Sequence, residues 1–201
     1  MFVRPFAPPH DTAPLYFVCL RTADAGRDAT HLHGDPALPG HVWLGAYLVL
    51  QPDLAWVVDD GDGRPVGYVV GTADTTAFQE LCERAWWPRL RERFPAGGSS
   101  SATSADQELV RLIHDPPSTP AAVVATHPSH LHIDLLPESQ GAGIGRVLME
   151  TLFAALAERG STGVSVGVDA TNAHALGFYR HLGFVDLATS TGAVWLGRAL
   201  D

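Results

Sequence analysis

A glycine-rich run near residue 140 has the composition of a loop that binds phosphate. It lies between a predicted strand and a predicted amphipathic helix, and it consists of Gln140, Gly141, Ala142, Gly143, Ile144, Gly145 and Arg146. Unhindered backbone N–H groups at the start of a helix, together with the positive end of the helix dipole, form a site for phosphate oxygens. Arg146 adds a permanent cation in the first turn. The pattern therefore predicts a phosphate-binding loop.

Three kinds of phosphate-binding loop compete for this run. A Walker loop ends in Gly-Lys-Ser/Thr, whereas Gly145 is followed here by Arg146 and Val147. A dinucleotide-binding fingerprint needs G-x-G-x-x-G in the first strand and helix of the chain, and this G-x-G-x-G run comes late. The remaining pattern is Q/R-x-x-G-x-G/A, which Gln140, Gly143 and Gly145 match.

That third pattern resembles the loop with which the GNAT superfamily of N-acetyltransferases binds the pyrophosphate of acyl-coenzyme A. A second block, N-x-x-A-x-x-F-Y-x-x-x-G-F from Asn172 to Phe184, is similar to the other coenzyme-binding block of that superfamily. A narrower resemblance, to the acetyltransferase-like domain that ends eukaryotic O-GlcNAc hydrolases, is carried by residues 66–74, 86–88 and 132–134. The resemblance implies an α/β fold: a central mixed, largely antiparallel sheet, splayed at a bulge, with helices on both faces.

The resemblance also implies roles for single residues. The backbone of Leu135 and Leu136 would pair with the pantetheine arm, and Asn172 and Phe178 would contact the coenzyme. Tyr179 falls where many family members place the tyrosine that protonates the departing thiolate, a task that suits a phenol of pKa ~10. These residues also have purely structural alternatives. The two leucines would pack in the core, Asn172 would be a helix N-cap, and Tyr179 would be a buried tyrosine with its hydroxyl bonded elsewhere.

The sequence offers several candidates for the group that takes a proton from an attacking amine. An amine of pKa ~10.4 is mostly protonated near neutral pH, so a carboxylate, a histidine or an ordered water must accept a proton. The run Ser129 to Leu136 alternates strictly, which places His132 and Asp134 on one face of a strand. Asp134 and His132 are therefore the candidates, and Asp169 is a further one. A purely structural hydrogen-bond acceptor is the alternative for Asp134.

These residues predict an acetyltransferase that moves the acetyl group of acetyl-CoA to an amine by direct attack in a ternary complex. No cysteine nucleophile with a histidine partner is evident in the sequence for an acyl-enzyme. The expected acceptor is an amine-bearing small molecule or a protein lysine, and an O-acetyltransferase is a closer variant. The alternative is a catalytically weak or inactive module of the same fold that binds coenzyme A or another protein.

Other residues invite weaker hypotheses. The ten histidines suggest a metal site, but they lack HExxH or Cys/His spacing, so no metal is expected. Cys19 and Cys82 are too few for a disulfide scaffold and are expected in the core. Trp86 and Trp87 could line an acceptor pocket, although aromatic residues at helical spacing are more often core.

The elements that must position these residues follow from hydrophobic periodicity. Helices are predicted from Asp11 or Thr12 through Cys19 and over 143–159 and 172–182, with another over 75–94 that Pro88 breaks or kinks. Runs rich in β-branched residues predict strands over 2–6, 54–58, 66–72, 129–136, 164–168 and 193–198. We expect one acyltransferase domain over residues 1–201, with an insertion around 75–120 whose Gly- and Ser-rich part, 94–106, looks least ordered.

Composition narrows the class of protein. The 201 residues include 13 Lys and Arg against 22 Asp and Glu, and the formal charge of −9 opposes broad binding to nucleic acid. No run of ~18 apolar residues predicts a membrane span, and the N-terminus shows no secretory signal, so a cytoplasmic location is expected. A homodimer is an expectation from the family alone.

Overall fold

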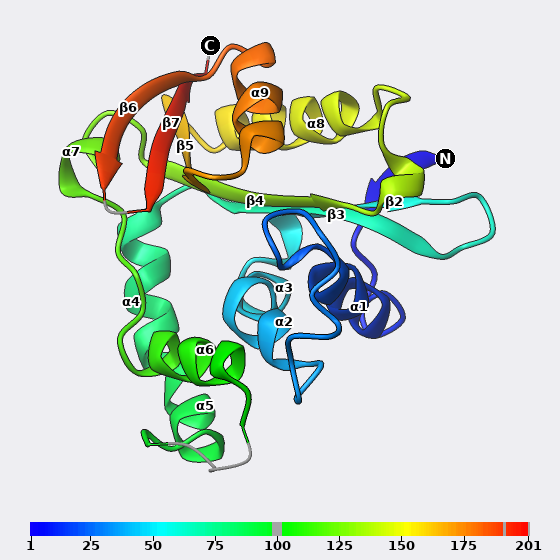
Figure 1. The fold of residues 1–201 in the computed structure, drawn as a ribbon. Helices are drawn as coiled ribbons and strands as arrows, with labels where there is room; N and C mark the ends of the chain where they lie inside the picture. The colour runs from blue at the N-terminus through cyan, green and yellow to red at the C-terminus, as the bar shows by residue number, and fades with distance from the viewer. Residues whose placement is uncertain (98–101, 191, 201) are drawn as a thin grey trace.

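One mixed sheet forms the centre of the molecule. The computed structural model describes the chain except for residues 98–101, 191 and 201. Its sheet has seven strands in the order β1-β2-β3-β4-β5-β7-β6, and only β4 and β5 run parallel to each other (Figure 1). The strands are β1 (Phe2–Pro5), β2 (Ala55–Asp59), β3 (Pro65–Thr72), β4 (Ser129–Leu135), β5 (Gly163–Asp169), β6 (Val185–Ser190) and β7 (Ala193–Ala199). This confirms the expected mixed, largely antiparallel sheet.

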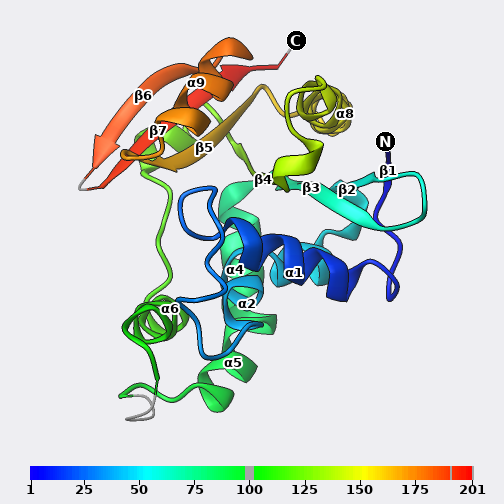
Figure 2. The same cartoon turned by 45° about the vertical axis from the view of Figure 1, so that its right-hand side comes forward.

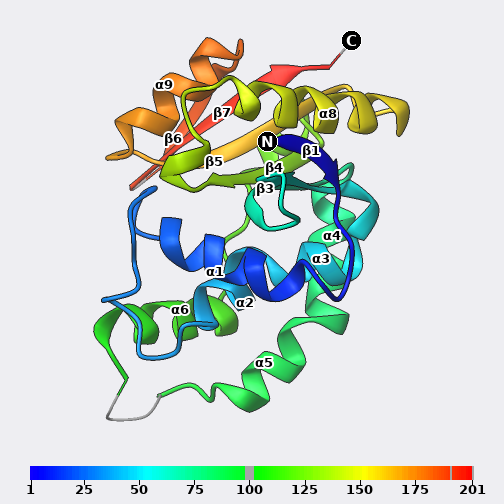
Figure 3. The ribbon, with the colours of Figure 1, turned by 90° about the vertical axis from the view of Figure 1, so that its right-hand side faces the viewer.

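Helices cover both faces of the sheet, as expected. Two of them, α8 (Ile144–Glu158) and α9 (Ala173–His181), lie on one face (Figures 1 and 3). The other face is covered by α1 (Thr12–Thr22), α2 (Leu38–Trp43) and α3 (Gly45–Leu50). Beyond them lie α4 (Thr75–Ala85), α5 (Trp87–Arg93) and α6 (Ser104–His114) (Figure 2). The short helix α7 (Ala121–Val124) precedes β4 in the chain (Figure 1).

The burial pattern explains this layering. All eight residues of β3 are buried, because the strand has a sheet neighbour on each side and a helix layer on each face. On α8, Leu148, Leu152 and Leu156 recur every four residues and are fully buried, so one stripe of that helix packs on the sheet. The cysteines Cys19 and Cys82 are both free and buried, as predicted for core residues.

The predicted helix over 75–94 breaks where expected. The first part, α4, ends at Ala85, and α5 begins at Trp87 with Pro88 in its first turn, where a missing N–H is tolerated. The Gly- and Ser-rich part of the insertion, 94–106, lies partly outside the described residues. The helices α2, α3 and α7 and the strand β6 were not predicted, since short segments that contain glycine, proline or alternating polar residues show little periodicity.

The strands β4 and β5 begin as neighbours and then diverge. Within the described chain, β4 pairs with β5 only at Ser129 and His130, although it pairs with β3 as far as Leu135. The expected splay is therefore present. No register shift interrupts the pairing of β4 with β3, so the bulge that was expected with the splay is not seen there.

A cluster of buried serines holds the two strands together where they meet. The hydroxyl of Ser165 on β5 donates to the carbonyl oxygen of Ser129 on β4 at 3.2 Å. The hydroxyl of Ser129 lies 3.0 Å from the carbonyl oxygen of Ala73 and 2.6 Å from the hydroxyl of Ser161. Because buried hydroxyls need partners, this network fixes the point from which the strands separate.

Replacing Ser129 with alanine should destabilise the fold. The change removes a buried hydroxyl and leaves the carbonyl of Ala73 without this donor, which typically costs about 1–3 kcal/mol in free energy of unfolding. Urea denaturation of Ser129→Ala and wild type measures the difference. The matched control is Thr151→Ala, whose hydroxyl donates to Val147 on the exposed surface of α8 and whose loss should change stability by less than about 0.5 kcal/mol. Equal effects of the two substitutions would show that the serine cluster is not a structural anchor.

Candidate functional site

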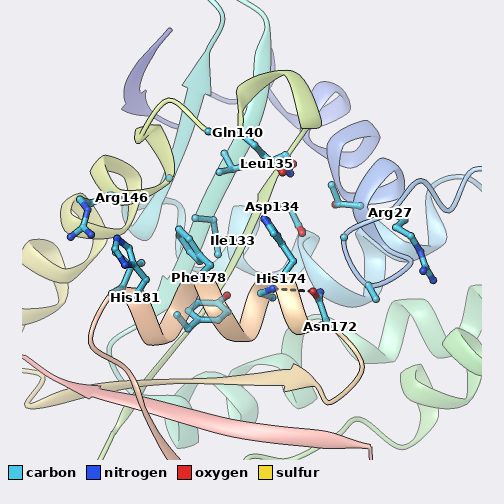
Figure 4. A pocket seen from close by; sticks show the side chains of 18 of the residues that line it. Arg27, Ile133, Asp134, Leu135, Gln140, Arg146, Asn172, His174, Phe178 and His181 are labelled. Atoms are coloured by element: carbon cyan, nitrogen blue, oxygen red, sulfur yellow. Dashed lines mark hydrogen bonds between the residues drawn. The ribbon is translucent and has the colours of Figure 1, made fainter.

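A cavity of about 570 Å³ lies beside the free edge of β4. We call it the glycine-loop pocket. Its walls come from β4, from the loop 140–146, from α9 and from the segment that follows α1 (Figure 4). Figure 4 shows Arg146 and His181 at one end and Arg27 at the other. The volume is typical of a pocket for a small molecule or cofactor.

The glycine loop presents unpaired backbone donors to this pocket. Gly143 is the N-cap of α8 with φ +78°, a left-handed conformation that suits glycine. The first N–H bonded in this turn is that of Arg146, which donates to the carbonyl of Gly143 at 3.0 Å. No described residue accepts a hydrogen bond from the N–H groups of residues 141–145. Such donors at a helix start attract an anion, as the sequence pattern predicted.

The edge of β4 that faces the splay offers further backbone groups. The N–H of Leu136 donates to the carbonyl of Val66 on β3 at 2.9 Å, so it is not open to a ligand. Backbone groups alternate in direction along an antiparallel pair, and those of Ile133 and Leu135 therefore face away from β3. The carbonyl of Leu135 accepts from the side-chain amide of Gln140 at 2.8 Å. Of the two predicted leucines, Leu135 lines the pocket, whereas Leu136 is buried and does not line it. Ile133 lines the pocket in addition to Leu135.

Only some of the loop residues predicted to bind the coenzyme line the pocket. Gly141, Gly143, Gly145 and Arg146 line the pocket, whereas Ala142 and Ile144 do not. The glycine at 145 allows close packing, because a Cβ there would come within 3.0 Å of the Leu135 side chain.

Asp134 is the carboxylate of the pocket. Its side chain accepts a short hydrogen bond from the hydroxyl of Tyr68 on the neighbouring strand. Burial raises the pKa of Asp134 to about 6, against the opposing effect of that hydrogen bond. A carboxyl group with its pKa in this range can take up and release a proton near neutral pH, which is typical of catalytic acids and bases.

Tyr179 lines the same pocket from α9 and is almost completely buried. Burial, with a smaller contribution from the charge of Asp134, raises the pKa of the Tyr179 hydroxyl well above its ordinary value. The phenol therefore keeps its proton at neutral pH. The structure brings together the predicted pair of Asp134 and Tyr179.

The remaining predicted residues of α9 also reach the pocket. Asn172 caps α9, its side-chain oxygen accepting from the N–H of Ala175 at 3.0 Å, and it lines the pocket as well. Phe178 lies close to Gly145 across the pocket. Sequence reasoning missed four polar lining residues, Thr22, Arg27, His174 and His181. His174 and His181 lie inside the recognised block, so their helical spacing from Phe178 could have revealed them, but no local pattern marks Thr22 or Arg27.

His132 does not line the glycine-loop pocket. It lines a second cavity of about 690 Å³, between β4, the ends of β5 and β7, and the helices α2 to α4. We call it the aromatic pocket. Burial lowers the pKa of His132 to about 4, so the imidazole is neutral at pH 7. His130, two residues earlier, uses both ring nitrogens, with the hydroxyls of Tyr47 at 2.6 Å and Thr75 at 2.8 Å, and is structural.

The two cavities meet the same strand at consecutive residues. Residues 130–132 line the aromatic pocket, and residues 133–135 line the glycine-loop pocket.

Asp169, the third candidate base, lies exposed in the lining of the aromatic pocket. Trp87 is buried and lines that pocket too, whereas Trp86 donates from its indole to the carbonyl of His41 at 3.0 Å. The two tryptophans thus have different roles.

Two further features concern the described residues only. In that part of the chain, no three His, Cys, Asp or Glu side chains are grouped as a metal ion would require. Nor does any of the described helices have the length and apolar character needed to cross a bilayer.

Comparisons with known proteins agree with this architecture. The chain is 28% identical over 203 residues to Protein O-GlcNAcase of Rattus norvegicus, a match that covers 98% of this chain and 22% of the relative. It is 24% identical over 169 residues to Mycothiol acetyltransferase of Renibacterium salmoninarum, covering 82% of this chain and 47% of the relative. The chain therefore spans less than half the length of these curated relatives, and the resemblance to O-GlcNAc hydrolases is confirmed.

Solved structures and family models extend the match. The crystal structure of SsHAT superposes with a TM-score of 0.91 at 41% identity, covering 99% of this chain and 98% of that one. The model of the acetyltransferase (GNAT) family matches residues 25–184, which include β4, the glycine loop and α9. On this evidence the chain belongs to the acetyltransferase (GNAT) family.

Proposed function

We propose that this protein transfers the acetyl group of acetyl-CoA to an amine. The observation that carries the proposal is the set of unpaired N–H groups in residues 141–145, which opens onto the free edge of β4 beside Asp134 and Tyr179. Membership of an acetyltransferase family and the likeness to a mycothiol acetyltransferase support the reaction type.

The residues of the glycine-loop pocket fit coenzyme A. The N–H groups of the loop and the guanidinium of Arg146 would hold the pyrophosphate. Arg146 is half-exposed and paired only loosely with Glu150, at 3.7 Å, so it is able to turn toward an anion. The outward backbone groups of Ile133 and Leu135 would pair with the amide-bearing arm, as a neighbouring strand would.

Acetyl-CoA, when bound, supplies an acetyl thioester whose carbonyl carbon an amine attacks. The N–H of Ile133, at the boundary between the two pockets, would polarise the carbonyl oxygen of this thioester. The carboxylate of Asp134 accepts a proton from the attacking amine. The hydroxyl of Tyr179, protonated at neutral pH, donates a proton to the leaving sulfur.

His132 is the second candidate for the proton acceptor, because its neutral imidazole lines the aromatic pocket. Its low pKa makes it a weaker base than Asp134. The rival function is a module that binds coenzyme A or a protein without turnover. Such a module needs the glycine loop but has no use for a protonated phenol next to a carboxyl group of raised pKa.

Gly143→Ala should weaken acetyl-CoA binding at least tenfold. The new Cβ stands among the donor N–H groups, and an L-residue in the left-handed region is strained by about 1–2 kcal/mol. Gly160→Ala is the matched control: Gly160 has φ +80°, has no neighbour within 4 Å of an added Cβ and lies outside the pocket. Calorimetric titration measures both dissociation constants. Equal affinities for the two variants would exclude the loop as the pyrophosphate site.

Tyr179→Phe should separate chemistry from binding. Loss of the proton donor should lower kcat by about 10²–10⁴-fold, while the dissociation constant of acetyl-CoA changes by less than about twofold. Release of free thiol measures turnover, and Tyr16→Phe, outside both pockets, is the control. Unchanged turnover in Tyr179→Phe would remove the phenol from the mechanism, and a wild type that binds acetyl-CoA but acetylates no amine would favour the binding module.

The pH dependence of kcat should identify the base. A carboxylate acts as a base only when ionised, so with Asp134 as the base kcat rises with pH to a plateau above pH 6, the region of its raised pKa. With His132 as the base the same rise would lie near pH 4. Measurement at saturating amine keeps the ionisation of the free amine out of the profile. In Asp134→Asn the limb near pH 6 should disappear together with most of the activity.

A further inference from the structure

The aromatic pocket has the size and lining of a site for a compact organic molecule. Its volume of about 690 Å³ falls within the ~300–1,000 Å³ of pockets for small ligands. Five aromatic side chains from different segments line it, namely Trp43, Tyr47, Phe78, Trp87 and Trp195. Acetyl transfer to an amine requires only that the amine can reach the thioester. It does not by itself require a pocket lined by five aromatic side chains.

The rings hold one another in place. Tyr47 stacks on Phe78 with centroids 4.5 Å apart, and His132 meets Tyr47 edge-on at 5.5 Å. Trp43 lies 6.2 Å from His132 on another side. The indole of Trp195 covers Gly167 so closely that a Cβ there would come within 3.1 Å of the ring. A preformed aromatic wall of this kind favours flat apolar groups and cations.

The charge around the same pocket is negative. Three carboxylates, those of Glu80, Glu83 and Asp169, contribute to the lining, against the single cation of Arg84. Glu83 is held by Arg91 through two hydrogen bonds, at 2.8 and 3.0 Å. Glu80 is only loosely paired with Arg84, at 3.7 Å, and Asp169 bonds to Thr171 rather than to a cation. Negative potential therefore remains at Glu80 and Asp169.

Several separate segments of the chain surround the aromatic pocket. They are α2 and α3, α4, residues 116–119 and the ends of β5 and β7. In Figure 1 the segment between α6 and α7, which contains residues 116–119, runs from α6 up to the sheet. A lysine side chain is narrow and would leave most of the aromatic surface uncovered.

The pocket also borders the reacting groups. His132 belongs to its lining, and the next residue, Ile133, belongs to the glycine-loop pocket. The N–H of Ile133 and the carboxyl of Asp134, which belong to the glycine-loop pocket, are thus one and two residues from His132 along β4.

From this geometry we infer that the acceptor is a small cationic amine with an aromatic body, bound in the aromatic pocket with its nitrogen toward His132. The inference rests on the proposed acetyl transfer. The bound ammonium first gives one proton to the carboxylate of Asp134, which passes it to solvent. The neutral amine nitrogen then bonds to the acetyl carbon, the carbon–sulfur bond breaks, and the sulfur receives the proton of Tyr179. The second proton lost by the nitrogen restores the phenol, so the products are the amide, the free thiol and one proton in solvent.

A panel of amines tests this assignment. The protein and acetyl-CoA are incubated separately with tryptamine, 2-phenylethylamine, spermidine and a lysine-containing peptide, and products are identified by mass spectrometry. We expect kcat/KM for the two aromatic amines to exceed that for spermidine and peptide at least tenfold. Comparable or faster acetylation of spermidine or peptide would overturn the inference and leave the proposed function intact. Acetylation of no amine, with acetyl-CoA bound, would overturn both.

Two pairs of variants test the pocket itself. Trp195→Leu should raise KM for tryptamine about 3–10-fold through loss of the indole face, while Trp56→Leu on β2, outside both pockets, should not. Glu80→Gln should raise KM about 2–3-fold at low salt, an effect that 0.5 M salt removes. Glu108→Gln is the matched control, an exposed helical glutamate paired with Arg111. No change in KM for Trp195→Leu and Glu80→Gln would place the acceptor elsewhere.

Discussion

The separation of β4 from β5 is the feature on which the rest of the site depends. Unpaired backbone groups inside a protein are costly, so parallel strands normally stay paired along their length. Here pairing ends after His130, and Ile133 and Leu135 are left facing the gap. The buried serines at Ser129 and Ser165 fix the closed end of the gap, and Gln140 satisfies the carbonyl of Leu135. The edge that remains can act as a strand partner for a ligand.

The gap also divides the molecule electrostatically. Arg27, Arg146 and the unpaired N–H groups of the loop lie in the glycine-loop pocket, whereas Glu80 and Asp169 lie in the aromatic pocket. The net charge of −9 does not reveal this division, because a sum over the whole chain does not say where the charges lie. Under the proposed function, an anionic cofactor and a cationic acceptor would each be attracted to their own side, which favours a ternary complex over binding in one shared cavity.

Much of the site could be predicted because its signals are local. The loop from Gln140 to Arg146 and the cap at Asn172 depend on neighbours within four residues, and the strict alternation of residues 129–136 marks a strand with one polar face. The aromatic pocket could not be predicted in this way. Its lining comes from α2, α3, α4, β5 and β7, and two of these helices are too short to show periodicity. Thr22 and Arg27 could not be predicted as pocket residues either, because only tertiary packing brings the end of α1 and the segment after it close to β4.

The pair His132 and Asp134 shows how alternation can be correct and still mislead about function. Both side chains leave β4 on the same face, as their spacing of two predicts, about 6.6 Å apart along the strand. That distance is enough to put them in different cavities, because the boundary between the pockets crosses the strand at residue 133. Burial favours the neutral form of both side chains. It therefore raises the pKa of the Asp134 carboxyl and lowers the pKa of the His132 imidazole. Asp134 consequently titrates near the physiological range while His132 stays neutral. Under the proposed function, one strand would therefore provide a proton acceptor in the glycine-loop pocket and an uncharged wall in the aromatic pocket.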